Sequence, residues 1–439
     1  MRAFLALVLT TATFILAQGT GNVYLFHLFY IMAAALISSY LWAWLNMRGL
    51  DARRELLNSR TQVGKAVDEH LVIENRSRWP KLWVEAEDRS NLPGHWPRFV
   101  TGLPPRSSRH LRVRTPCQLR GKYTLGPIVL RSSDPLGLFQ FRKRIPVSDE
   151  ILVYPATEDI LSFPLPPAEL PGGTATRQRT HHTTTNVSSV REYAPGDRFN
   201  RIHWPSSARL GRLIVKEFEQ DPTADIWIVL DMDYRVQATA GRRRRPAEGP
   251  PPPDEVRTPD STEEYIVTAA ASLARHFILR QRRNTGLIGW GQHREVIPPE
   301  REPRQFYNIL ESLAILRAQG TTPLAEVLAA EGNRFGRQTS AIVISSSPDP
   351  DWVRAGLRDL LYRGIYAAVV LVDGFSFEGW HSISQVETEL QALNVPYCVL
   401  KKDQPIGPAL SSAAEYGDWP GGARYIREHY QELIPYRQR

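Results

Sequence analysis

The sequence contains little cysteine and lacks the motifs of several enzyme classes. Its 439 residues include two cysteines, Cys117 and Cys398, which are too few for a disulfide framework or for a thiolate metal cluster of three or four ligands. Neither a Gly-x-Ser-x-Gly sequence nor a Gly-x-x-x-x-Gly-Lys-Ser/Thr loop occurs, so the motifs of serine hydrolases and of nucleotide phosphate binding are missing. We interpret both cysteines as buried thiols. Because the motifs above are missing, the sequence gives no support to an enzymatic function.

Acidic residues are fewer than basic ones. The chain has 54 Lys and Arg against 46 Asp and Glu, a net charge of +8. Such a charge would suit nucleic acid, but the sequence has no aromatic and basic motif of a known nucleic-acid reader. We expect no nucleic-acid partner, because a cytoplasmic face next to anionic lipid accounts for the charge more simply.

Charged side chains are also absent from a long stretch near the N-terminus. Residues 23–45 contain no Asp, Glu, Lys or Arg and are long enough to cross hydrocarbon as a helix. Residues 3–17 are apolar or small, and glycines with small polar residues separate the two runs at 18–22. Such residues suit a tight turn at a membrane surface. Residues 1–50 are therefore predicted to form a transmembrane helical hairpin.

Basic residues flank both ends of this hairpin. Arg2 precedes it, and Arg48, Arg53, Arg54 and Arg60 follow it. The positive-inside rule then predicts that the C-terminal domains lie in the cytoplasm, at an inner membrane of a bacterial type. The alternative for residues 1–17 is a cleaved signal peptide. Cleavage would leave one span with the soluble part outside, which conflicts with the arginines that follow the second run.

A β-rich domain is predicted at residues 61–160. Short runs of β-forming residues at 70–74, 82–86 and 111–114 are separated by turn residues, a spacing typical of a small antiparallel sandwich. Residues 161–189 are rich in Pro, Gly and Thr and are predicted to be a linker.

The pattern changes to alternating strands and helices over residues 224–430. Apolar runs rich in β-branched residues occur at 226–230, 285–290, 341–344, 366–372 and 397–400, and segments with apolar residues at helical spacing lie between them. This alternation predicts a doubly wound α/β domain. One basic and Pro-rich insertion at 241–261 has no periodic apolar face, so it is predicted to be a disordered loop.

Residues 190–220 carry a distinctive motif. It begins with Arg191-Glu192-Tyr193, continues through Pro195-Gly196-Asp197 and Arg201-Ile202-His203-Trp204 to Ala208-Arg209, and ends with Glu217-Phe218-Glu219. In order and spacing this motif closely resembles the signature of the domain of unknown function 58 family. The resemblance implies an N-terminal helical hairpin, a β-rich segment and a domain similar to von Willebrand factor A. It also implies association with MoxR-type AAA+ ATPases.

The polar residues of this signature allow two interpretations. Glu192, Asp197, His203, Glu217 and Glu219 could form a general acid/base set. The same carboxylates could instead form a buried salt-bridge network with arginines, joining the β-rich segment to the α/β domain. We favour the network, with one exposed side for a partner, because charge-paired motifs perturb pKa values without catalysis. The candidate partner-binding residues are Arg191, Glu192, Tyr193, Gly196, Asp197, His203, Trp204, Arg209, Glu217 and Glu219.

The resemblance to von Willebrand factor A also implies a metal site. Such domains hold Mg²⁺ with an Asp-x-Ser-x-Ser loop, a Thr from a second loop and an Asp from a third. Here Asp231 and Asp233 fall in the first loop and Thr322 in the second, but Arg235 and Ser346 stand where ligands are expected. The predicted Mg²⁺ site is therefore incomplete, and we expect no cofactor. In the alternative, Asp231 and Asp233 cap loops and pair with arginines.

Together these features predict a membrane-anchored cytoplasmic interaction or scaffold protein. By resemblance it works with a MoxR-type AAA+ ATPase in the assembly or maturation of protein complexes. The alternative function is a hydrolase whose active site is formed by the signature residues.

Overall fold

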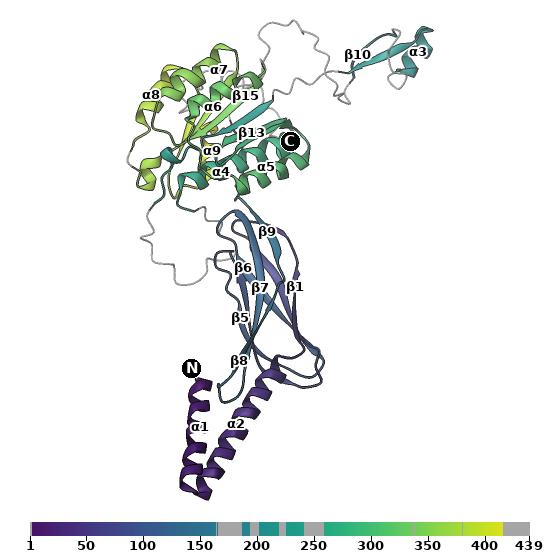
Figure 1. Cartoon of the computed structure of the whole chain (residues 1–439). Helices are drawn as coiled ribbons and strands as arrows, with labels where there is room; N and C mark the ends of the chain where they lie inside the picture. Colours follow the sequence, from purple (N-terminus) through teal and green to yellow (C-terminus); the bar gives the residue numbers. More distant parts are fainter. Residues whose placement is uncertain are drawn as a thin grey trace.

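The computed structural model describes residues 2–163, 165, 187–193, 202–218, 225–240, 259–336, 339–379 and 381–415. These residues form an N-terminal pair of helices, a β-rich domain, an α/β domain and a short ribbon that carries part of the signature (Figure 1). The insertion predicted to be disordered lies outside the described residues, except for positions 259–261.

The helical pair consists of α1 (Arg2–Thr20) and α2 (Val23–Met47). Both helices are long and apolar enough to cross a membrane. They are joined at Gly21, which has a φ of +65°, and the Asn22 side chain accepts a hydrogen bond from the Tyr24 backbone N–H at 2.9 Å. Asn22 is thus the N-cap of α2.

The β-rich domain begins at Leu50, and the predicted start at residue 61 is wrong. Strand β1 (Leu50–Leu56) follows α2 after two residues. Its sequence is largely charged, but Leu50 and Ala52 alternate into the core, which is enough to bury one face of an edge strand. Helix α2 therefore continues almost directly into the β-rich domain.

Two sheets form this domain and share a core of apolar residues, among them Leu71, Ile73, Val84 and Leu130. One sheet has the order β1-β3-β6, with β3 at Ala66–Asn75 and β6 at Ser107–Pro116. The other has the order β2-β9-β7-β4-β5, with β8 pairing with β7. Its strands are β2 (Arg60–Gln62), β4 (Lys81–Ser90), β5 (Arg98–Leu103), β7 (Gly121–Ser133), β8 (Gln140–Ile145) and β9 (Asp149–Tyr154). The pairing is antiparallel except between β2 and β9, which are parallel, so the second sheet is mixed.

The α/β domain contains a six-stranded sheet in the order β14-β13-β12-β15-β16-β17. Its strands are β12 (Ile226–Leu230), β13 (Thr285–Trp290), β14 (Arg294–Glu300), β15 (Ser340–Ser345), β16 (Tyr366–Val372) and β17 (Tyr397–Leu400). Strand β14 is antiparallel to β13, and the other neighbours are parallel. The first strand of the domain thus lies in the middle of a mixed sheet.

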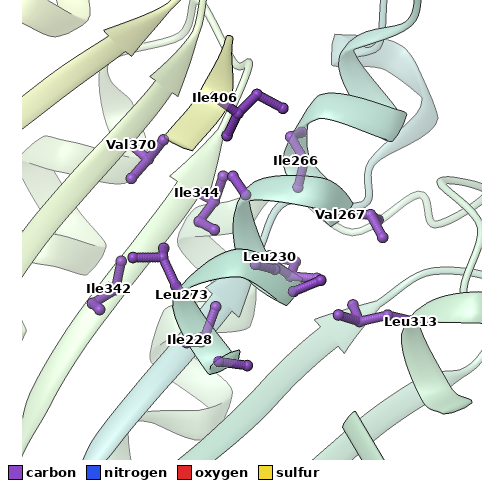
Figure 2. Packing of buried hydrophobic residues seen from close by; sticks show 14 of the residues in the cluster. Ile228, Leu230, Ile266, Val267, Leu273, Leu313, Ile342, Ile344, Val370 and Ile406 are labelled. Atoms are coloured by element: carbon purple, nitrogen blue, oxygen red, sulfur yellow. The ribbon is translucent and has the colours of Figure 1, made fainter. Parts of the chain in front are cut away.

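Helices cover both faces of this sheet. Ile228 and Leu230 of β12 pack on one face with Leu273 and Leu313 (Figure 2), whereas Trp227 and Val229 pack on the other. The first face is covered by α4 (Thr262–Ala274), its continuation η3 (Arg275–Arg280), α5 (Pro303–Ile315) and α9 (Ile406–Glu415). The second is covered by α6 (Leu324–Glu331), η5 (Trp352–Leu357), α7 (Arg358–Tyr362) and α8 (Ser384–Ala392). Short turns η2 (Tyr234–Val236), η4 (Gly332–Arg334) and η6 (Gly374–Phe377) complete the domain.

The predicted linker at 161–189 is shorter than expected at both ends. Ile160 and Phe163 pack into the core of the α/β domain, and the rings of Phe163 and Phe277 lie 6.0 Å apart. At the other end, β10 (Val187–Glu192) starts before residue 189. Ile160 and Phe163 therefore belong to the core of the α/β domain.

The signature forms its own two-stranded sheet. Strand β10 pairs antiparallel with β11 (Ile214–Phe218), and α3 (Trp204–Leu210) lies between them in the chain. The apolar residues Leu213, Val215 and Phe218 would suit a strand of the large sheet, but β11 pairs with β10 instead.

Candidate functional site

The carboxyl end of β12 is the first candidate site. Strand β12 lies between β13 and β15, so the chain leaves it toward one side of the sheet and later returns on the other. Ligands of open α/β sheets bind at such switch points, outside the carboxyl ends of the strands. Asp231 and Asp233 follow β12 here, and Ser345, Ser346 and Ser347 end or follow β15.

Asp231 is a buried carboxylate at this edge. Its Oδ2 accepts a hydrogen bond from Ser345 Oγ at 2.6 Å, and its Oδ1 accepts one from the Asp233 backbone N–H at 3.3 Å. Burial raises the pKa of Asp231 to about 6, against the opposing effect of the Ser345 hydrogen bond. A perturbed carboxyl group at a ligand-binding edge marks a candidate functional position.

The carboxylate of Asp233 is paired with the guanidinium of an arginine. Its Oδ1 accepts from Nε of Arg235 at 3.0 Å, and its Oδ2 accepts from Nη2 of Arg235 at 2.6 Å. The same Nη2 donates to the carbonyl of Thr321 at 2.8 Å. The Asp233 hydrogen bond raises the pKa of Arg235, which keeps the guanidinium charged beside the carboxylate.

The residues at this edge do not fit Mg²⁺ as they stand. Mg²⁺ requires an octahedral set of oxygen ligands, whereas Arg235 covers the carboxylate of Asp233. Ser346 Oγ donates to the carbonyl of Val236 at 2.9 Å, and Thr322 is half-buried in the loop after Gly320. The carboxylate oxygens at this edge can accept hydrogen bonds, but the cation bound there is the guanidinium of Arg235.

A hollow of about 400 Å³ lies along the same edge of the sheet. It is formed by the segment after β16, the residues before and at the start of α8, and the end of β17 with the residue after it, namely Asp373, Phe375, Ser382, Ile383, Glu387, Val399 and Lys401. The Asp373 side chain accepts from the Phe375 backbone N–H at 3.2 Å, which holds the loop. The hollow is lined by both polar and apolar side chains, which suits a small polar group.

The signature ribbon is the second candidate site. His203 Nδ1 and Ser206 Oγ lie 2.7 Å apart at the start of α3, and Ser207 Oγ accepts from the Ile214 backbone N–H at 2.9 Å. Trp204 is 63% exposed, and Arg209 is exposed on the same short helix. Exposed Trp and Arg are the residue types that dominate binding energy in protein interfaces.

The remaining signature residues are described in part. Arg191 and Glu192 lie in β10 opposite Val215 and Ile214, and Glu217 lies in β11 opposite Ser189. Tyr193 is half-buried, and its backbone N–H donates to the carbonyl of Leu213 at 2.9 Å. Gly196, Asp197 and Glu219 lie outside the described residues. The predicted salt-bridge network therefore stays a prediction.

Among the described residues, Arg120 joins the β-rich domain to the α/β domain, which is the role that we assigned to the signature. This fully buried side chain of the β-rich domain donates from Nε to the carbonyl of Leu313 and from Nη2 to that of Leu316, both at 2.9 Å. It also lies 2.5 Å from Glu263 and 2.5 Å from Glu264 of the α/β domain. Sequence analysis missed this junction because its residues are far apart in the chain, and Glu263 and Glu264 look like ordinary first-turn acids of a helix.

Sequence analysis also missed a buried ionic cluster inside the β-rich domain. Glu69, Asp88 and His95 are buried, with ligand-type atoms all within 4.8 Å of one another. The guanidinium of Arg54 lies 2.8 Å from Glu69 and is also paired with Asp88. Burial raises the pKa of Glu69, while His95 and Arg54 oppose that rise. Because Arg54 already supplies a cation, we interpret the cluster as structural.

Comparisons with known proteins agree with the resemblance read from the signature. Residues 189–247 match the family described as "Protein of unknown function DUF58". The chain is also 23% identical over 358 residues to the "Uncharacterized protein YeaD" of Bacillus subtilis (strain 168), with 78% of this chain and 82% of that protein covered.

Similarity to solved structures is weak. Proximal thread matrix protein 1 from the mussel byssus has a TM-score of 0.28 and 12% identity, covering 44% of this chain and 48% of that chain. The CARDB domain of a Pyrococcus furiosus protein in complex with di-metal ions has a TM-score of 0.19 and 12% identity, covering 24% of this chain and 91% of that chain. The similarity that covers the signature is therefore the match of residues 189–247 to the DUF58 family model.

Proposed function

We propose that this chain is a membrane-anchored scaffold protein with its domains in the cytoplasm, which works with a MoxR-type AAA+ ATPase in the assembly or maturation of protein complexes. The observation that carries the proposal is the continuous connection from the apolar hairpin to the α/β domain. Two residues separate α2 from β1, and the buried Arg120 then joins the β-rich domain to the α/β domain. Such an arrangement holds a binding module at a fixed place above a membrane.

The anchor is supported by the helices and by the charges around them. Both α1 and α2 meet the length and hydropathy of a membrane span. Arg2 stands at one end of the hairpin and Arg48 at the other, which favours the cytoplasmic side for both ends. These two features support the proposed inner-membrane location with cytoplasmic domains.

The α/β domain is proposed to be a von Willebrand factor A-like binding module. Its support is the central position of β12, the helices on both faces and the acidic loop at the switch point. Arg235 bound to Asp233 favours contact with a protein partner over Mg²⁺ chemistry at this edge.

The ATPase is proposed to contact α3 of the signature ribbon. Trp204 and Arg209 are exposed there, and an aromatic with an arginine is the usual centre of a protein interface. Truncating either side chain should then weaken binding by at least about thirtyfold, since such centres contribute about 2 kcal/mol or more.

Co-purification tests this proposal. The full chain in mild detergent is mixed with the MoxR-type ATPase of the same organism and ATP, and the complex is followed by size-exclusion chromatography. We expect a complex with the wild type, and weaker binding by Trp204→Ala and Arg209→Ala. Trp96→Ala, which changes an 80% exposed tryptophan in the β4–β5 loop, should bind as the wild type does. Absence of a complex would contradict the partnership, and equal binding by all variants would exclude α3 as the contact.

A hydrolase built from the signature is the second candidate. One observation favours it, because the 2.7 Å contact between His203 Nδ1 and Ser206 Oγ is the geometry of a base beside a hydroxyl nucleophile. A fluorophosphonate probe would then label Ser206 in the wild type but not in His203→Ala. Failure to label the wild type would leave the contact as a local side-chain hydrogen bond at the start of α3.

A further inference from the structure

Large apolar side chains gather at one end of the β-rich domain. Trp79, Leu82, Trp83 and Leu136 are 64%, 61%, 56% and 62% exposed. They come from the segment between β3 and β4, the start of β4, and the turn between β7 and β8. Single exposed apolar residues are ordinary on a protein surface, but a group of them marks an interaction site. We call these four residues the membrane-proximal patch.

The patch lies beside the ends of the helical hairpin that are remote from its connecting turn. The carbonyl of Trp83 accepts from Nδ2 of Asn46 in α2 at 3.2 Å. The backbone N–H of Arg76, which precedes Trp79, donates to the carbonyl of Gly49 at 2.8 Å. Lys81 is buried, and its Nζ donates to the carbonyl of Leu45 in the last turn of α2, where a cation is favoured by the helix dipole.

The turn between β7 and β8 also lies beside the hairpin. The rings of Phe139 and Tyr40 lie 5.5 Å apart, edge to face, and Figure 1 shows β8 beside the ends of α1 and α2. Both carboxylate oxygens of Asp134 hold the turn, by accepting from the backbone N–H groups of Leu136 and Phe139 at 2.9 and 2.7 Å. Leu136 is therefore presented on a fixed turn.

Basic side chains surround the same end of the domain. Arg48, Arg78 and Arg142 are exposed, and the guanidinium of Arg48 lies 4.9 Å from the centre of the Trp44 ring. Tryptophan and arginine together are typical of the interface between hydrocarbon and headgroups, where an aromatic ring contacts lipid and a cation contacts phosphate.

We propose that this end of the β-rich domain is seated in the headgroup layer of a lipid bilayer, with the membrane-proximal patch in contact with lipid. The inference rests on the proposed anchoring of α1 and α2 in that bilayer. It adds that the domain itself touches the membrane, so that the rigid link after α2 and the patch together fix the tilt of the β-rich domain. The α/β domain is then held at a set distance from the bilayer.

Depth measurements on the full chain in phosphatidylcholine and phosphatidylglycerol vesicles test this placement. A cysteine introduced by Leu82→Cys or Leu136→Cys is labelled with an environment-sensitive fluorophore, and its quenching by aqueous iodide is compared with quenching by doxyl-labelled lipid. Cys117 and Cys398 are buried, so the unmodified chain gives the background. Trp96→Cys, at an 80% exposed position in the β4–β5 loop, is the matched control, and Ile31→Cys, 67% exposed within α2, reports on the anchor.

We expect iodide quenching at positions 82 and 136 to be several-fold weaker than at 96, with quenching by doxyl-labelled lipid at 82, 136 and 31. Lipid quenching at 31 with full iodide access at 82 and 136 would overturn the placement and leave the anchor intact. Loss of lipid quenching at 31 would overturn the anchor itself. Protection of 82 and 136 from both quenchers would show that a second copy of the chain covers the patch, which also contradicts the proposal.

Discussion

Two arginine side chains of the β-rich domain are completely buried, and they have different roles. Arg54 lies within the domain, where it pairs with Glu69 and Asp88, both also buried. Arg120 lies at the surface of the domain, where two carboxylates and two main-chain carbonyls of the α/β domain surround it. A guanidinium has five fixed donors, so it can neutralise a buried acidic cluster or bridge two domains. The environment, and not the residue type, decides between these roles.

Each domain carries one native cysteine that can report on these roles separately. Cys117 belongs to the β-rich domain and Cys398 to the α/β domain. Burial raises the pKa of Cys117 to about 11 and that of Cys398 to about 12. Because the thiolate is the reactive form, labelling at neutral pH should require each domain to open.

The largest effect is expected from Arg54→Met. It leaves the buried carboxylates of Glu69 and Asp88 without their arginine, and removing one partner from a buried ion pair costs about 3–5 kcal/mol. Thiol labelling of Cys117 should become much faster, with a smaller increase for Cys398, because the α/β domain loses only the Arg120 junction when the β-rich domain opens. The control is Arg53→Met, since Arg53 is the neighbouring residue but is 56% exposed. Equal labelling rates in the two variants would contradict the structural role of the cluster.

Arg120→Met should have the next largest effect, of about 3 kcal/mol on the junction. Arg317 still lies 3.2 Å from Glu264, so part of the acidic charge stays paired. In calorimetry we expect the β-rich and α/β domains to unfold as two separate transitions instead of together. Lys122→Met removes an exposed pair with Glu150 and should leave the profile as in the wild type, because exposed pairs contribute little. A single unchanged transition in Arg120→Met would refute the junction.

The contrast also shows what sequence patterns can reveal. The strand-helix alternation of the α/β domain was readable because burial imposes a period on apolar residues. The two apolar helices were readable because each is a long apolar run with almost no charge. Strand β1 was missed because its buried positions, Leu50 and Ala52, lie among charges that pair on the other face. Both arginine clusters were missed because their members come together only in the fold, as Arg54 with Asp149 does across 95 residues.

The sequence predicted which residues lie together at the candidate metal site, but not how they pair. Asp231, Asp233 and Arg235 are neighbours in sequence, and the loop after a buried strand predicts that they lie at one edge. That Arg235 would bind Asp233, with Thr321 as a second acceptor, depends on the path of another loop. The predicted salt-bridge network of the signature, which includes Arg191 and Glu217, rested on a motif, and a motif does not say which element it packs against.

The buried carboxyl group of Asp231 predicts a pH dependence. Burial raises its pKa from 3.8 to about 6, so the folded state binds more protons than the unfolded state between these values. Stability is therefore highest below pH 4 for this group and falls as pH rises to about 6, by on the order of 3 kcal/mol at a value of 1.36 kcal/mol per pKa unit. Asp231→Asn should flatten this slope in the unfolding of the α/β domain, and Asp359→Asn, an exposed acid, should not. An unchanged slope in Asp231→Asn would contradict the assignment.

The smallest effect is expected from Mg²⁺. In the wild type, millimolar Mg²⁺ should leave the melting temperature of the α/β domain unchanged, because Arg235 covers both carboxylate oxygens of Asp233. Arg235→Ser frees these oxygens and adds a hydroxyl where a ligand is expected. Melting of this variant should then rise with Mg²⁺, by an amount that corresponds to about 1 kcal/mol when the cation is several-fold above its dissociation constant.

The control for this last prediction is Arg304→Ser, which removes an equally charged but 71% exposed arginine that pairs with Glu302. It separates a local effect at Asp233 from a general effect of lowering the positive charge, which would attract Mg²⁺ to the surface at low salt. Stabilisation of Arg235→Ser alone would mean that one guanidinium keeps the cation out. Equal stabilisation of the wild type by Mg²⁺ would instead mean that Arg235 leaves Asp233 when the cation arrives, because the ion can only stabilise a state that it binds.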